Sequence, residues 1–263
     1  MGYRRPMGGF SFASVILSYF LVAGGLLSGT LLIGYTHTSS QPLQFVMWAA
    51  GSFVGGFFAA RASRGSTIIE PAIGAVLLIV TIVAMIGGSS VGKLMWGSGE
   101  MTSVGKFIGE LAGCLAVGAL AGAFVSEKVM GEATLSGLPW VLYAALTAFG
   151  ASFVGTFIAT VLFAKGDGAT VETLAKMMLA GVGIGCLLGG LAIGASARLR
   201  VLGASFLGGA VGVAGFFLMI TVQEGSTHDK DIVAGIAVLA AGGAIVTLIG
   251  SVLGWVTIGK REA

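Results

Sequence analysis

The stretches without a charged side chain place the strongest constraint on how this chain can fold. Between Pro6 and Ala60 there is no Asp, Glu, Lys or Arg, a run of 55 residues. One transmembrane helix needs about 20 apolar residues, so the run is too long for a single helix. A polar tract at residues 36–42 divides it. We therefore expect two membrane-spanning helices before Arg61.

The composition extends this expectation to the whole chain. Hydrophobic residues make up 56% of the 263 residues and charged residues 10%, with a mean hydropathy of +1.01. Soluble domains carry roughly 25% charged residues, so this chain has too little polar surface for a cytosolic enzyme, a nucleic-acid-binding protein or a disordered regulator. The 46 glycines follow no three-residue period and are typical of closely packed membrane helices. The sequence predicts an all-α integral membrane protein whose main partner is the lipid bilayer.

Charged residues and turns divide the chain into eight predicted spans. The third opens with Glu70 and Pro71, which suit the first turn of a helix. The fourth contains Lys106 and Glu110 and needs independent support. The eight predicted spans cover residues 12–34, 43–60, 70–88, 106–125, 139–163, 177–195, 201–222 and 232–257.

The positions of the arginines support the fourth span. With eight spans all seven arginines fall on one side of the membrane, whereas seven spans would divide them between the two sides. Lysine and arginine are enriched in cytoplasmic loops. We therefore expect a multi-pass protein of a bacterial-type inner (plasma) membrane, with both termini in the cytoplasm.

An internal repeat relates the two halves of the chain. A shift of 134 residues aligns Gly51–Ile86 with Gly185–Ile220 without a gap, and it places Arg64 on Arg198 in the same short loop. Each half holds an even number of spans, so the halves would share one orientation about an axis along the membrane normal. The expected domains are a four-helix repeat at 1–126, a cytoplasmic linker at 127–138 and a second four-helix repeat at 139–263.

Glycines four residues apart form rows on several predicted spans. Such residues share one helix face and let two backbones approach closely. We expect helix packing, and the alternative is a lining that leaves room for a solute or lets helices slide. The shift of 126 that aligns Gly29 with Gly155 and the shift of 132 that aligns Gly118 with Gly250 extend the repeat. The predicted packing glycines are Gly51, Gly55, Gly56, Gly118, Gly122, Gly185, Gly189, Gly190, Gly250 and Gly254.

Glu110 is the carboxylate that lies most clearly within a predicted span. Lys106 stands four residues earlier and is in reach of it on a helix. The first interpretation is an ion pair near the membrane interface. The alternative is a carboxylate that faces a cavity and couples transport to protons or cations, because an intramembrane charge is costly and often functional.

Four arginines stand at two corresponding turns, and Glu70 follows the first of them. The charge distribution across the membrane explains the arginines as topology determinants, and the alternative is binding of an anionic lipid headgroup or an acidic partner. We expect Glu70 at the start of a helix, near the first turn. The four arginines are Arg61, Arg64, Arg198 and Arg200.

The sequence contains no pattern that predicts enzymatic chemistry. There is no metalloprotease, nucleophile-elbow, phosphate-loop or dinucleotide-binding motif, and no cysteine pair at metal-ligand spacing. Cys114 and Cys186 lie in apolar runs and are interpreted as packing residues. We expect no catalytic residue, no cofactor and no metal site.

Two classes of function remain after these exclusions. One is a permease or channel for a small solute, favoured by the tandem repeat and the glycines at mid-membrane depth. The other is a structural or accessory subunit of a larger membrane complex, favoured by spans that are nearly free of polar groups. The partners expected in the second case are other membrane subunits or further copies of this chain.

Overall fold

The computed structural model is helical throughout the part of the chain that it describes, residues 10–62, 68–88, 101–129, 138–163, 171–196, 202–224 and 230–259. This confirms the predicted all-α fold. Two π-helical turns, η1 and η3, each continue a long helix at its carboxyl end. The elements are α1 (Phe12–Thr36), α2 (Gln41–Ala62), α3 (Ile69–Gly88), α5 (Met101–Phe124), η1 (Val125–Val129), α6 (Leu138–Phe163), α7 (Val171–Ser196), α8 (Leu202–Glu224), α9 (Lys230–Gly254) and η3 (Trp255–Gly259).

Seven of the described helices are long and apolar enough to cross a membrane. They include α5, which covers the predicted fourth span. The remaining long helix is α3, which has 20 residues and whose apolar stretch covers at least Ile69–Ala84. The structure therefore shows a polytopic membrane protein, and the eighth span stays a prediction.

The polar tract at 36–42 separates α1 from α2, as the sequence predicts. His37 caps α1 in the left-handed conformation, with φ of 47°, and its N–H donates to the Gly34 carbonyl. This carbonyl would otherwise lack a partner at the helix end. α2 then begins at Gln41, with Pro42 in its first turn, where the missing N–H costs nothing.

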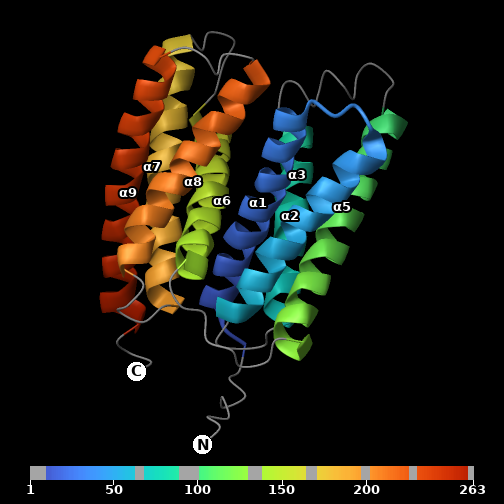
Figure 1. Cartoon of the computed structure of the whole chain (residues 1–263), viewed down its shortest axis with the longest axis horizontal. Helices are drawn as coiled ribbons and strands as arrows, with labels where there is room; N and C mark the ends of the chain where they lie inside the picture. The colour runs from blue at the N-terminus through green and yellow to red at the C-terminus, as the bar shows by residue number, and fades with distance from the viewer. Residues whose placement is uncertain are drawn as a thin grey trace, which may run out of the picture.

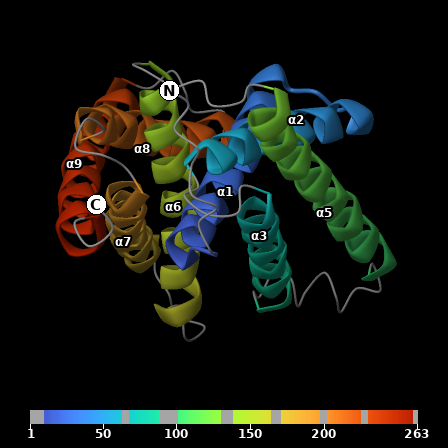
Figure 2. The same cartoon turned by 90° about the horizontal axis from the view of Figure 1, so that it is seen from below.

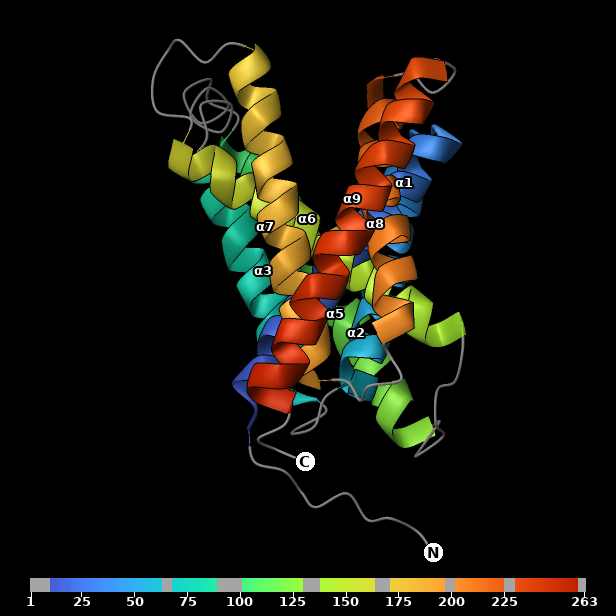
Figure 3. The same ribbon diagram turned by 90° about the vertical axis from the view of Figure 1, so that its left-hand side faces the viewer.

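The helices form two groups that meet at α1 and α6. In the first group α1 packs on α2 and α3, and α2 packs on α5. In the second group α6 packs on α7 and α8, while α9 packs on both α7 and α8. Figure 1 shows the two groups side by side, with the start of α1 and the end of α9 at the same lower end of the bundle. Figure 3 shows α9 crossing α7 near that end, while the two helices diverge toward the upper end.

The outward faces of the helices are apolar. Large aliphatic side chains are exposed on every long helix, for example Val117 on α5 (68% exposed) and Val238 on α9 (71% exposed). Contiguous apolar surface of this extent is incompatible with water and is matched by lipid chains. The helices therefore contact the lipid bilayer.

A shallow apolar groove lies between α3 and α5, whose ribbons diverge in Figure 2. Residues of both helices line it, Ile79 and Leu115 among them. In the second group, the pair α8 and α9 is packed more tightly, because Val213 of α8 lies where a side chain on Gly243 of α9 would stand. Gly243 thus permits the close approach of α8 and α9. Between α3 and α5, aliphatic side chains line the groove instead. The groove is lined by Ile79, Ile82, Ile108, Leu111, Ala112 and Leu115.

Candidate functional site

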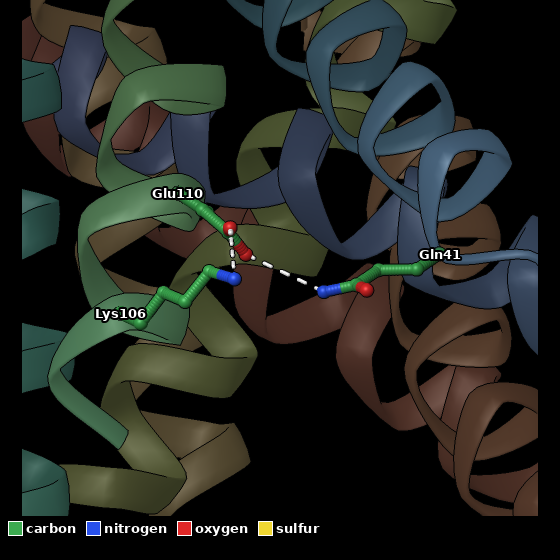
Figure 4. Close-up of polar contacts among 3 residues, drawn as sticks. All are labelled: Gln41, Lys106 and Glu110. Carbon is green, nitrogen blue, oxygen red and sulfur yellow. Dashed lines mark hydrogen bonds and ion pairs between the residues drawn. The ribbon is translucent and has the colours of Figure 1, made fainter. Parts of the chain in front are cut away.

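Glu110 and Lys106 form an ion pair on the surface of α5 near its upper end. Their closest charged atoms, Lys106 Nζ and Glu110 Oε1, are 3.8 Å apart. Gln41, the first residue of α2, donates from Nε2 to Glu110 Oε2 at 3.4 Å. Figure 4 shows the three side chains converging from the two helices. The contacts connect the start of α2 to α5.

The surroundings of this pair favour the local interpretation over a coupling role. The Glu110 side chain is 32% exposed and that of Lys106 is 75% exposed. A coupling carboxylate would face an interior cavity beyond the reach of a compensating charge. An exposed pair of this kind contributes about 0–1 kcal/mol. Glu110 therefore has the geometry of a surface contact between helices.

Of the four predicted arginines, the described part of the chain contains only Arg61. It stands at the end of α2, and its guanidinium carbon lies 5.7 Å from the centre of the Phe57 ring. This geometry is a cation–π contact. Arg64, Arg198 and Arg200 lie outside the described residues, so their predicted role in topology or headgroup binding stays a prediction.

Glu70 is fully buried. The sequence places it at the start of α3, as observed, but gives no indication of this burial. The carboxylate accepts a hydrogen bond from the Ser11 backbone N–H at 2.7 Å. Ser11 is the N-cap of α1, where backbone N–H groups lack partners within the helix. Glu70 thus joins the lower ends of α1 and α3.

The predicted packing glycines lie against the backbones of neighbouring helices. A side chain on Gly55 would collide with Leu21 and Val22 of α1, and one on Gly189 would meet Ala151 of α6. Such contacts bring helix axes close together and leave no lining for a solute at these points. On α5, by contrast, a row of three glycines has no described atom within 4 Å of where a side-chain carbon would stand. This row consists of Gly105, Gly109 and Gly113.

Small polar groups line the interior of the second group of helices. The Ser152 hydroxyl of α6 and the Cys186 thiol of α7 are 3.6 Å apart, and Thr247 of α9 lies beside the same thiol. One turn below Thr247, toward the lower end, is Ser251. All of these side chains are fully buried. The fully buried hydroxyl and thiol residues of this group are Thr147, Ser152, Cys186, Ser205, Thr247 and Ser251.

Two of these hydroxyls lack a hydrogen-bond partner among the described residues. They are Thr247 Oγ1 and Ser251 Oγ. Thr147 and Ser152 instead donate to the carbonyls of Tyr143 and Ala148 in their own helix. A buried hydroxyl without a partner costs about 1–3 kcal/mol, so the two unpartnered groups call for an explanation.

An apolar cluster fills the interior beside these polar groups. Phe149 of α6 and Phe216 of α8 meet edge to face at 6.5 Å between ring centres. Val182, Val213 and Met219 are buried in the same cluster, which also includes Cys186. Thr247 and Ser251 lie toward the lower end from this aromatic and aliphatic plug, whereas Cys186 belongs to it and Ser152 follows Phe149 by three residues toward the upper end of α6 (Figure 1).

Sequence reasoning did not find this polar group. The apolar run around Cys186 indicates a packing residue, and the patterns of charges and glycines say nothing about hydroxyls. The available indication was Thr247 and Ser251 at a spacing of four residues within an otherwise apolar span. In the first group the cluster formed by α1, α3 and α5 is aliphatic around Leu78 and Leu115. Buried hydroxyls occur in that group as well, at Ser14, Ser18 and Ser52, and the shift of 134 aligns Ser52 with Cys186.

Comparison with known proteins adds no assignment to this geometry. No family model, curated protein or solved structure matches the chain. Within the described helices, no three His, Cys, Asp or Glu side chains lie close enough to share a metal ion.

Proposed function

We propose that the chain is a multi-pass protein of a bacterial-type inner membrane, with α3 as its eighth span and both termini in the cytoplasm. Seven apolar helices of sufficient length support the multi-pass arrangement. α3 has 20 residues in all, about the length that crosses a bilayer. An even number of spans agrees with α1 beginning and α9 ending at the same end of the bundle (Figure 1).

The two helix groups are proposed to be structural repeats of the same orientation. Equivalent helices pair in the same way, since α1 packs on α2 and α3 as α6 packs on α7 and α8. The contact between α2 and α5 corresponds to that between α7 and α9. Each group also ends in a π-helical turn. These correspondences support a duplicated four-helix unit.

Individual glycine contacts support the same repeat. Gly74 of α3 lies against Tyr19 of α1, and Gly208 of α8 lies against Ala145 of α6. The shift of 134 takes Gly74 to Gly208, and the shift of 126 takes Tyr19 to Ala145, so the aligned residues make the same contact in both halves. The agreement of two independent shifts at one contact is not expected of unrelated halves.

The contact between α1 and α6 has the form expected at a twofold axis. Gly24 of α1 lies against Leu146 of α6, and Gly150 of α6 lies against Phe20 of α1. A shift of 126 interchanges the two contacts. In a self-complementary interface each contact occurs twice in this manner.

For the last helix of each half, the contacts favour a different register from the sequence alignment. Gly122 lies against Phe53, and Gly250 lies against Leu187. The shift of 134 aligns Phe53 with Leu187. These contacts align Gly122 with Gly250. The sequence alignment instead pairs Gly118 with Gly250, one helical turn away.

The function we propose is non-enzymatic, a permease or channel that passes a small solute through the second half. The observation that carries it is the group of buried hydroxyls and a thiol that line the interior between α6, α7, α8 and α9. Hydroxyl side chains within membrane helices form hydrogen bonds across helix interfaces, and a pathway for a neutral solute would use groups of the same kind. The apolar plug at Phe149 and Phe216 would correspond to a closed state of this pathway.

Flux through purified protein in liposomes tests this function. Stopped-flow light scattering would compare shrinkage and swelling of vesicles with and without the full chain, using water, glycerol, urea and salts of monovalent ions. Faster equilibration of at least one solute with protein supports a permease or channel. Rates equal to those of empty vesicles for every solute would overturn the proposal.

The second candidate is a structural or accessory subunit of a membrane complex. It is favoured by the row of Gly105, Gly109 and Gly113 on α5, which no other part of the described chain covers. Purification of the chain from its native membrane in mild detergent separates the two candidates. Stoichiometric co-purification of other membrane chains supports a subunit, and a chain that runs alone or as a homo-oligomer contradicts it.

A further inference from the structure

Thr247 and Ser251 lie in the interior of the second half, at the meeting point of three helices. The backbone of Gly190 on α7 lies against both residues. On the side of α8, Thr247 Oγ1 is 2.7 Å from the position that a side-chain carbon on Gly209 would take. The Thr247 hydroxyl therefore points toward α8 at a glycine, where no side chain covers it.

The Thr247 and Ser251 hydroxyls are fully buried and without a partner among the described residues. The thiol of Cys186 and the hydroxyl of Ser152 lie on the upper side of Thr247, at the level of the apolar plug. The set presents hydrogen-bond donors and acceptors but no charge. Hydroxyls can replace the water shell of a neutral solute, whereas the dehydration of an ion needs charged or numerous ligands.

We propose that Ser152, Cys186, Thr247 and Ser251 form a binding site for a small neutral solute that carries hydroxyl or amide groups, at the narrowest point of the pathway through the second half. This inference rests on the permease proposed above and assigns its binding residues and class of solute. Thr247 and Ser251 supply hydroxyls without a described partner. The Ser152 hydroxyl already donates to the Ala148 carbonyl and can accept a further hydrogen bond, and Cys186 is in contact with the plug. Gly190 and Gly209 let the backbones of α7 and α8 pack directly against Thr247, so in this closed arrangement the site is in contact with helix backbone on both sides.

Substitution of Thr247 tests the site in proteoliposomes, with glycerol and urea as probes. Thr247→Val removes the hydroxyl and keeps the volume, so the protein-mediated flux of the responding probe should fall about tenfold, as expected for one lost hydrogen bond. Thr247→Ser retains the hydroxyl and should keep most of the flux. The matched control is Ser52→Ala, which removes a fully buried hydroxyl of α2 that donates to the carbonyl of Trp48 in its own helix.

Thiol chemistry gives a second and independent readout. The chain has two cysteines, Cys186 at the site and the partly exposed Cys114 on α5. Methylmercury should block flux in the Cys114→Ala variant, which retains Cys186. It should not block flux in Cys186→Ser, which keeps a hydrogen-bonding group in the pathway.

The outcomes separate failure of the site from failure of the function. Flux in wild-type protein that Thr247→Val leaves unchanged, or a methylmercury block that follows Cys114, would overturn the site and leave the permease in place. Absence of flux for every solute would overturn both. Loss of flux in Ser52→Ala equal to that in Thr247→Val would show a general packing defect and would also overturn the site. Size-exclusion profiles and thermal midpoints establish that each variant is folded.

Discussion

The paired glycines at the contact between α1 and α6 allow a quantitative test of the proposed twofold arrangement. A side-chain carbon on Gly24 would lie 2.7 Å from the Leu146 carbonyl carbon, and one on Gly150 would lie 2.6 Å from the Gly24 nitrogen. Ordinary van der Waals contact begins at 3.4 Å. A single methyl group therefore requires α1 and α6 to separate by about 0.7 Å or more.

The free-energy change of Gly24→Ala and of Gly150→Ala has two opposing terms. Overpacking costs about 1–3 kcal/mol. Replacement of glycine by alanine within a helix gains up to about 1 kcal/mol. The net loss is about 0–3 kcal/mol for each variant, which lowers the thermal midpoint by roughly 0–12 °C at about 2–4 °C per kcal/mol. The symmetry of the contact predicts similar losses at the two positions.

The double variant provides the sharper measurement. Both methyl groups separate the same two helices, so the second substitution should cost less than the first, and the combined loss should be smaller than the sum of the single losses. Gly109→Ala is the matched control, because no described atom lies within 4 Å of the place its new methyl group would occupy. Thermal unfolding in detergent, followed by intrinsic fluorescence, measures all four proteins. Single variants at least as stable as Gly109→Ala would refute the close approach, and strictly additive losses would refute a single shared contact.

Three further predictions follow from other contacts. Exchange of the charges by Lys106→Glu with Glu110→Lys should change the thermal midpoint by no more than about 2 °C, because an exposed pair contributes little; a loss above about 5 °C would indicate a buried partner for Glu110. Tyr19→Phe removes the hydrogen bond between the Tyr19 and Thr81 hydroxyls at 3.0 Å and should cost about 0.5–1.5 kcal/mol in detergent unfolding, so an unchanged stability would contradict that bond. Single cysteines placed on the arginine-bearing side should not react with an impermeant maleimide added outside intact cells, and external labelling of any of them would overturn the orientation. The variants are Ser63→Cys, Ala197→Cys and Glu262→Cys.

Helix positions were predictable because charge and hydropathy act locally. The predicted first span at 12–34 agrees with α1, since the polar tract beyond it supplies a turn and new helix ends at His37 and Gln41. The predicted fourth span is covered by α5 despite its two charges, which lie near a helix end where they reach the surface.

The details of the interior were not predictable from the same information. The burial of Glu70 depends on Ser11, which is 59 residues away in the sequence and donates to the carboxylate. The polar interior depends on helices α6, α7 and α9 meeting at Cys186 and Thr247, whose sequence separation carries no periodic pattern. Residue spacing reveals one face of one helix, whereas a site assembled from three helices depends on their packing.

The Gly24 and Gly150 contact has a consequence for how such a chain can change over time. An interface in which each contact occurs twice is the kind that joins two identical subunits, and a fused chain holds the two units at a fixed ratio and high local concentration. In a homodimer any serine or threonine introduced into one interior would appear in both, with twice the cost of burial. Within one polypeptide the second half can carry Thr247 while the first half, which buries Ser18 and Ser52, keeps aliphatic residues around Leu78. Covalent linkage thus allows one half to specialise while the other remains a scaffold.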